Sequence, residues 1–99
     1  MANKMRPIHP GEILEDELEE IGISASALAR YLSVPANRIY SIINRQRSIT
    51  ADTALRLAKF FGTSPEFWLN LQSDFDLKTA IKKSGKRIEK EVIPSEEVA

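Results

Sequence analysis

The chain has 99 residues, no cysteine and a formal net charge of zero at pH 7. This length accommodates one domain with a modest core, for which a packing of several helices is economical. The lack of cysteine excludes a disulfide framework and a thiolate metal site. The N-terminus has no apolar signal core, and no apolar run approaches the roughly 20 residues that span a bilayer. The sequence therefore predicts a cytoplasmic protein without a membrane segment.

The zero net charge conceals two oppositely charged regions. Residues 1–23 contain two basic and six acidic residues, a net charge of −4, whereas residues 34–61 contain five basic residues and one acidic residue, a net charge of +4. A local basic face matters more for nucleic-acid binding than the total charge does. The second region is therefore a candidate DNA-binding surface, and the acidic region needs a separate explanation.

The first half of the chain predicts two short helices and no strand. Residues 10–21 carry apolar residues at helical spacing, begin with a proline suited to the first turn, and are followed by Gly22, which suits a helix end. The apolar stripe comprises Ile13, Leu14, Leu18 and Ile21. Ser24 or Ser26 can cap the second helix, and the Ser-Val-Pro sequence at 33–35 ends it.

Two further helices follow the turn. The third is expected over about residues 36–44, and Thr50 is expected to cap the fourth, which Gly62 ends. The third helix is expected to bury Ile39, Ile42 and Ile43. The apolar stripe of the fourth comprises Ala54, Leu55, Leu57, Ala58 and Phe61. The pattern is typical of helices that pack one face on a shared core.

A fifth helix is expected to start after Ser64, a capping serine followed by a first-turn proline, and to reach Ala80 or Ile81. The folded domain is therefore expected to span residues 1–81. Residues 82–99 are charge-dense and are expected to form a mobile tail, although the KRIEKEVI segment can also extend the helix or pair with a partner.

The second and third helices and their short turn are typical of a unit that places its second helix in the major groove of DNA. Ala25 and Ala29 are small enough to let the helices approach, and Val34 can fill the core beneath the turn. The candidates for reading bases are Ala36, Asn37, Arg38, Tyr40 and Ser41. The candidates for binding phosphate are Ser24, Ser26, Asn44, Arg45, Arg47 and Thr50.

Individual roles follow from side-chain chemistry, each with a plainer alternative. Asn37 and Ser41 lie one turn apart on the outer face; Asn can pair bidentately with adenine, and Ser can donate or accept. The alternative is that both are solvated polar positions. Tyr40 can contact the DNA backbone or pack half-buried, and Arg38 can reach guanine or phosphate or form a surface ion pair. Arg47 beside the helix is expected to bind phosphate, which positions the protein without reading sequence.

Histidine and aromatic residues give no support for an enzyme. The only histidine, His9, precedes Pro10 and is expected to help begin the first helix rather than act in catalysis. Phe67, Trp68 and Phe75 are typical of a core, although part of such a stripe can also close a dimer. The sequence offers no nucleophile, metal cluster or phosphate-binding loop. We therefore expect neither a catalytic activity nor a cofactor.

Three motifs resemble one family. They are HPGEIL from His9, ALARYLSVPxxRI across the helix pair, and TADTALRLAKFFGTSPEFWLNLQ from Thr50. Together they resemble the HigA (VapI-type) antitoxins, small helix-turn-helix proteins of the XRE, lambda-repressor-like class, over residues 8–81. The resemblance implies an all-α, five-helix fold and a homodimer that represses its own operon at a palindromic operator. It also implies neutralisation of an mRNA-cleaving RelE-like toxin.

Two positions depart from the family pattern, in which Ser33 and Arg45 are usually glycine. If the backbone is left-handed there, a residue other than glycine costs about 1–2 kcal/mol. Asn44 can take up the positive φ in place of Arg45, or the third helix can run one residue longer. The direction of the Arg45 side chain depends on which of these occurs.

The acidic region has an interpretation within this resemblance. A toxin that binds RNA would be basic, so the acidic face of the first helix is a candidate docking surface. The candidate residues are Glu12, Glu15, Asp16 and Glu19. The alternative is a solvated helix face. Two other functions remain open at this point: a stand-alone repressor without a toxin, and an adaptor that binds only protein.

Overall fold

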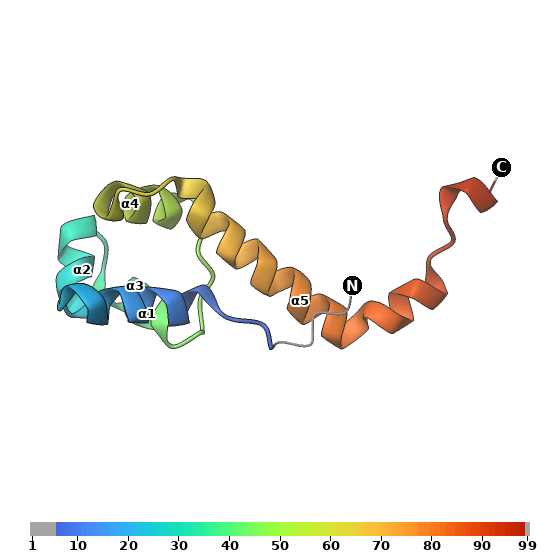
Figure 1. Ribbon diagram of the computed structural model, residues 1–99, viewed down its shortest axis with the longest axis horizontal. Coiled ribbons are helices and arrows are strands. Elements are labelled where there is room, and N and C mark those ends of the chain that lie inside the picture. The colour runs from blue at the N-terminus through green and yellow to red at the C-terminus, as the bar shows by residue number, and fades with distance from the viewer. Residues whose placement is uncertain (1–5, 99) are drawn as a thin grey trace.

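The computed structural model describes residues 6–98 as five α-helices and one short 3₁₀ helix, without a strand in that range. The helices are α1 (Pro10–Ile21), α2 (Ala25–Leu32), α3 (Ala36–Ile43), α4 (Ala51–Phe61), α5 (Pro65–Glu91) and η1 (Ser95–Glu97). Figure 1 shows α1 to α4 gathered at one end of the molecule and α5 leading away from them. The all-α expectation is confirmed; Lys4 and the rest of residues 1–5, with residue 99, lie outside the described range.

Side chains just ahead of four helices cap their first turns, as the sequence predicts. The Ser24 hydroxyl accepts a hydrogen bond from the Ala27 N–H, so Ser24 rather than Ser26 caps α2. Thr50 and Ser64 cap α4 and α5 in the same way. The cap of α1 is a histidine. These side chains satisfy backbone N–H groups that have no partner inside the helix.

Within residues 6–98, four residues that follow helices have a left-handed backbone, and only two of them are glycine. Gly22 and Gly62 both have φ 74° and end α1 and α4, as expected. Ser33 has φ 58° and Arg45 has φ 63°, although neither is glycine. Asn44 keeps φ −80° and does not take up the positive φ. The two non-glycine residues therefore each carry about 1–2 kcal/mol of strain.

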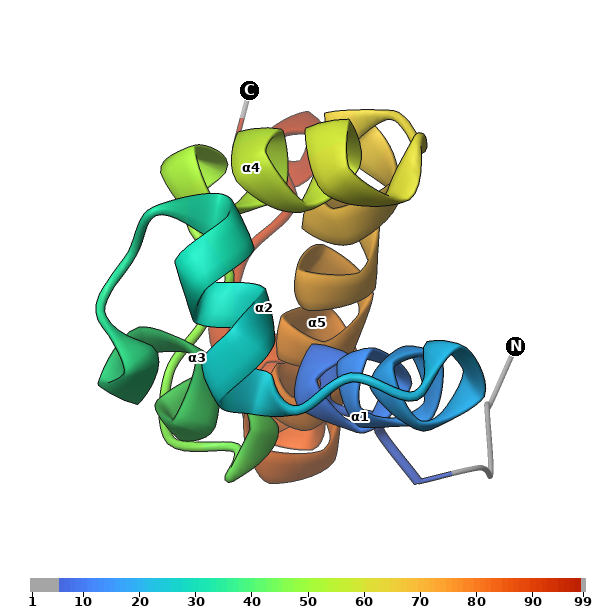
Figure 2. The ribbon, with the colours of Figure 1, turned by 90° about the vertical axis from the view of Figure 1, so that its left-hand side faces the viewer.

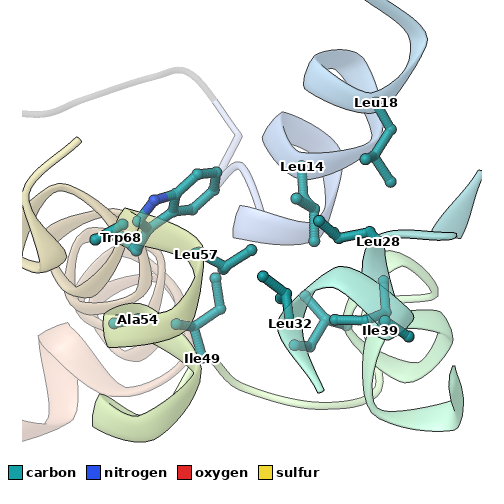
Figure 3. Close-up of a cluster of buried hydrophobic side chains, with 12 residues drawn as sticks. Leu14, Leu18, Leu28, Leu32, Ile39, Ile49, Ala54, Leu57 and Trp68 are labelled. Atoms are coloured by element: carbon teal, nitrogen blue, oxygen red, sulfur yellow. The ribbon is translucent and has the colours of Figure 1, made fainter. Parts of the chain in front are cut away.

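The core lies where the five helices meet. Figure 3 shows leucines of α1, α2 and α4, an isoleucine of α3 and the indole of α5 pointing toward one another. Trp68 is fully buried, and its ring N–H donates to the Thr63 hydroxyl at 3.0 Å, so its polar atom is satisfied. The buried apolar residues are Leu14, Leu18, Leu28, Ala29, Leu32, Ile39, Ile42, Ile49, Ala54, Leu57, Ala58 and Trp68.

Two residues expected on the apolar stripes are exposed instead. Leu55 is 60% exposed because it is rotated away from the face of α4 that Ala54, Leu57 and Ala58 bury. Ile21 is 48% exposed because it lies in the last turn of α1, beyond Leu18, the last buried residue of that helix. The stripes are therefore narrower than the sequence suggests.

The fifth helix is longer than the sequence predicts. It does not end at Ala80 or Ile81 but continues to Glu91. Lysine, arginine and glutamate dominate the added turns, and these residues have high helix propensity. Its buried residues, Trp68 and Gln72, belong to its first turns, and the distal half packs on no other helix in Figure 1. Within residues 6–98, none of the helices combines the length and apolar character of a membrane span.

The start of α1 touches the end of α3 at Gly11. A Cβ atom at this position would lie 2.0 Å from the carbonyl oxygen of Ile42. No side chain fits that distance, so only glycine lets the two helices approach so closely. This contact explains why a glycine follows Pro10 inside a helix, where glycine is otherwise unfavourable.

We predict that Gly11→Ala destabilises the fold by about 1–3 kcal/mol, because the new methyl group must push α1 away from α3. Thermal or urea unfolding followed by circular dichroism measures this change. Gly85→Ala is the matched control: its Cβ would meet only the Ile81 side chain at 3.4 Å. That variant should be neutral or stabilised by up to about 1 kcal/mol. Equal stability of the Gly11→Ala variant and the natural chain would contradict the close approach.

Candidate nucleic-acid interface

The helix α3 has one buried and one exposed side. Ile39 and Ile42 are fully buried and hold its inner side on the core. Figure 2 shows α2 and α3 lying side by side below α4 at the end of the molecule that the first four helices form. On the outer side, Ala36, Asn37 and Tyr40 are exposed and Ser41 is half-buried. Four of the five predicted base-reading residues thus lie on the outer side of α3, three of them exposed.

The fifth, Arg38, is already paired within the chain. Its Nη1 lies 2.6 Å from Oδ2 of Asp52, and Nε of Arg56 lies 2.9 Å from the same oxygen. These hydrogen bonds, from Arg56 first and then from Arg38, lower the pKa of Asp52. Arg56 also donates from Nη1 to the carbonyl oxygen of Leu32 at 2.8 Å. The surface ion pair considered as the plainer alternative for Arg38 is therefore present.

A hollow of about 420 Å³ opens beside this ion pair, at the start of α4. Its walls are Arg38, Arg47, Ser48, Thr50, Asp52, Thr53 and Arg56. Arg47 is exposed and forms no ion pair within residues 6–98. The Thr50 hydroxyl accepts from the Thr53 N–H at 3.4 Å, and the first turn of α4 adds the positive end of the helix dipole. Cationic side chains around a helix start suit an anionic phosphate.

Arg45 is directed toward α1. Its Nε lies 3.6 Å from Oε2 of Glu12. The same carboxylate accepts from the His9 backbone N–H at 3.1 Å and from both terminal nitrogens of Arg6. Chiefly because of the hydrogen bonds from Arg6, the pKa of Glu12 falls to about 2. Glu12 thus accepts a hydrogen bond at the start of α1 and pairs with Arg45. Phosphate binding by Arg45 remains a prediction.

The buried His9 is the residue that caps the start of α1. Its Nδ1 accepts from the Gly11 N–H at 2.9 Å, and its ring forms a T-shaped pair with the ring of Phe75, with centroids 4.8 Å apart. Burial, reinforced by the charge of Arg45, lowers the pKa of His9. The uncharged ring keeps the lone pair that caps the helix. The sequence-based expectation that His9 helps begin α1 is confirmed.

The remaining phosphate candidates lie at the ends of α2 and α3. Ser24 is exposed, and its hydroxyl proton remains available while the oxygen caps α2. Ser26 is half-buried within α2, and Asn44 is exposed at the end of α3. Arg47 and Thr50 line the hollow at the start of α4, whereas Ser24 lies at the start of α2 and Asn44 at the end of α3.

The acidic residues of α1 lie on a different face. Glu15, Asp16 and Glu19 are exposed and unpaired among the described residues, unlike Glu12. A groove of about 480 Å³ runs from this face toward α3. It is lined by Glu15, Leu18, Glu19, Gly22, Ile23, Ala25, Tyr40, Ile43 and Asn44. Its rim is acidic and its floor is largely apolar.

Two residues that position the interface, Gln72 and Ile49, are not predicted as such from the sequence. Gln72 is buried in α5, and its Oε1 accepts from the backbone N–H of Ile49 at 2.8 Å, while its Nε2 donates to Asp76. Ile49 is itself buried in the core. Together they anchor the loop after α3 to α5. The available signal was a glutamine one helical turn after Trp68, on the buried face of α5.

Comparisons with known proteins agree with this geometry. Residues 14–68 match the family described as helix-turn-helix. Virulence-associated protein I of Dichelobacter nodosus is 54% identical over 79 residues, which cover 79% of this chain and 73% of that protein.

Two solved structures share the fold. An addiction module antidote protein of the HigA family from Coxiella burnetii is 67% identical with a TM-score of 0.89, covering 91% of this chain and 99% of that one. The Pseudomonas aeruginosa antitoxin HigA, solved with the higBA promoter, is 54% identical with a TM-score of 0.87, at the same coverages. Proteins of this kind bind DNA and regulate rather than catalyse. The chain belongs to the HigA family of helix-turn-helix antitoxins.

Proposed function

We propose that this chain is the antitoxin of a toxin–antitoxin pair, which neutralises an mRNA-cleaving RelE-like toxin and represses its own operon at a palindromic operator. The observation that carries the DNA-binding part is the outer face of α3, polar and unoccupied, beside the arginine-lined hollow at the start of α4. The related Pseudomonas aeruginosa antitoxin, solved with the higBA promoter, supports the same reading for this chain.

In the proposed complex, α3 enters the major groove and its outer residues meet base edges. Asn37 and Ser41 offer the hydrogen-bonding groups, and Ala36 offers a methyl contact to thymine. Arg47 and the start of α4 meet the phosphates beside the groove, with Ser24 at the start of α2. Base contacts then select the sequence, and phosphate contacts fix the orientation of the domain.

A palindromic operator requires a two-fold protein, and the distal half of α5 offers the surface for a second copy. Leu77 at the middle of α5 and Ile81 and Ile88 beyond it are 60%, 59% and 49% exposed. With Ala80 and Gly85 they line an apolar groove of about 320 Å³. A stripe at helical spacing on an unpacked helix is the geometry that a symmetric helix pair buries. We therefore assign the second copy of this chain to the distal half of α5.

The toxin is assigned to the acidic face of α1. Glu15, Asp16 and Glu19 are exposed, and the adjoining groove has an acidic rim and an apolar floor. An RNA-cleaving toxin carries basic residues for its own substrate, so the charges are complementary. Glu12, whose carboxylate holds the start of α1, is left out of this surface.

Asn37→Ala and Arg47→Ala test the division of roles on DNA. Asn37→Ala removes hydrogen bonds to a base edge, so discrimination at one base pair should fall by about 1–3 kcal/mol. Arg47→Ala removes a phosphate contact, so all duplexes should bind more weakly and the salt slope should fall by about 1. Fluorescence anisotropy with the upstream promoter fragment and single-substituted duplexes measures both effects.

Two controls remove the same side-chain types elsewhere. Asn70→Ala on α5 and Arg30→Ala in the last turn of α2 should leave DNA binding unchanged. The titration also reports stoichiometry, for which the proposal requires two chains per palindromic duplex. Identical responses of the Asn37 and Arg47 variants to every duplex would show that the assigned roles are wrong, and one chain per palindrome would rule out the dimer.

Charge reversal on α1 tests the toxin surface. The product of the adjacent gene, expected to be a small basic RNase, should bind a Glu15→Lys, Glu19→Lys variant about tenfold or more weakly by calorimetry, because attraction becomes repulsion. A Glu66→Lys, Asp74→Lys variant carries the same charge change on α5 and should bind normally. Unchanged affinity of the α1 variant would move the toxin elsewhere. Absence of any such adjacent gene would leave a stand-alone repressor.

A further inference from the structure

Asp52 joins three parts of the helix-turn-helix unit through one carboxylate. Its Oδ2 accepts from Arg38 on α3 at 2.6 Å and from Arg56 on α4 at 2.9 Å. Arg56 continues to the carbonyl oxygen of Leu32, the last residue of α2, at 2.8 Å. Asp52 and Arg56 therefore link the Arg38 side chain to α4 and, through the Leu32 carbonyl oxygen, to α2 in the free chain.

This arrangement contributes little to stability. The side chains of Asp52 and Arg56 are 55% and 40% exposed, and exposed ion pairs contribute about 0–1 kcal/mol. The ion pair does, however, restrict the movement of the Arg38 guanidinium, and the Asp52 carboxylate reduces the positive charge beside the outer face of α3. An arginine without a partner is flexible and attracts any phosphate, whatever the sequence.

We propose that Asp52 is a positioning residue for operator recognition: by holding the Arg38 guanidinium against the first turn of α4, it raises the preference for operator over other DNA while lowering affinity for DNA in general. The inference rests on the proposed DNA binding and adds to it a residue that sets the ratio of the affinity for the operator to the affinity for other DNA. Without the carboxylate, Arg38 is free to follow the nearest phosphate, and the hollow gains one unit of positive charge. The added charge strengthens binding to all DNA alike, whereas the released Arg38 contacts phosphate instead of keeping its position on the operator, so the ratio of operator binding to other binding falls through Arg38.

The test compares the full-length natural chain with Asp52→Asn on the operator and on a scrambled duplex of equal length, over a series of salt concentrations. Asp52→Asn should bind the scrambled duplex about threefold to tenfold more tightly. Its salt slope should be steeper by up to about 1, and its operator-to-scrambled ratio should fall about tenfold. Asp52→Glu, which keeps the charge, should restore at least part of the ratio.

A double-variant comparison shows whether Asp52 acts through Arg38. Once Arg38→Ala is present, adding Asp52→Asn should change the ratio by less than twofold, because the held group is gone. Asp74→Asn is the matched control: it removes an exposed carboxylate 3.0 Å from Lys78 on α5 and should leave the ratio unchanged. The unfolding midpoint of Asp52→Asn should stay within about 3 °C of the natural chain, as expected for an exposed ion pair.

The outcomes separate this inference from the function on which it rests. If the natural chain shows no preference for the operator, the proposed function fails. If the natural chain discriminates and Asp52→Asn discriminates equally well, only the positioning role is overturned. A lowered ratio accompanied by a large loss of unfolding stability, or a ratio that still falls tenfold on the Arg38→Ala background, would also overturn it.

Discussion

The contact between Gly11 and the Ile42 carbonyl oxygen fixes the end of α3, and other features of the site depend on it. The two helices approach so closely that a Cβ at Gly11 would lie 2.0 Å from that oxygen. At the same junction His9 caps α1, and Glu12 meets Arg45 at 3.6 Å. Because Ile39 and Ile42 are also buried, the inner side of α3 is held on the core and its outer side is turned away from it.

The zero net charge resolves into oppositely charged surfaces, to which the proposed function assigns different partners. Two of the arginines around α3, Arg38 and Arg56, form ion pairs with Asp52, whereas Arg47 is exposed. On α1, Glu12 is used internally, whereas Glu15 and Glu19 face solvent. Because exposed ion pairs stabilise weakly, these pairs matter more for where charges point than for the stability of the fold. In the proposed function, DNA meets the outer face of α3 and a basic toxin meets the acidic face of α1. The groove between the two faces is lined by Tyr40 and Asn44, which are DNA candidates, as well as by Glu15 and Glu19.

The helical fold, most helix caps and much of the core were predictable from the sequence, whereas contacts between particular distant residues were not. Ser24, Thr50 and Ser64 were recognised as candidate caps because a cap depends on a few neighbouring residues. The pair Arg38–Asp52 and the bond from the Ile49 N–H to Gln72 join residues 14 and 23 positions apart, so no local pattern contains them. The sequence predicts too short a fifth helix because the apolar periodicity fades where the helix leaves the core. The high helix propensity of the residues beyond that point nevertheless continues the helix.

An NMR titration of the full chain with its palindromic operator maps the backbone amides that respond to DNA and so tests directly whether α3 and the start of α4 bind it. We expect the largest shift changes at the start of α2, along the outer face of α3, and in residues 45–53. Amides of Glu15, Asp16 and Glu19 should change little. Changes concentrated on α1, with those of α3 unaffected, would contradict the claim that α3 and the start of α4 form the DNA-binding surface.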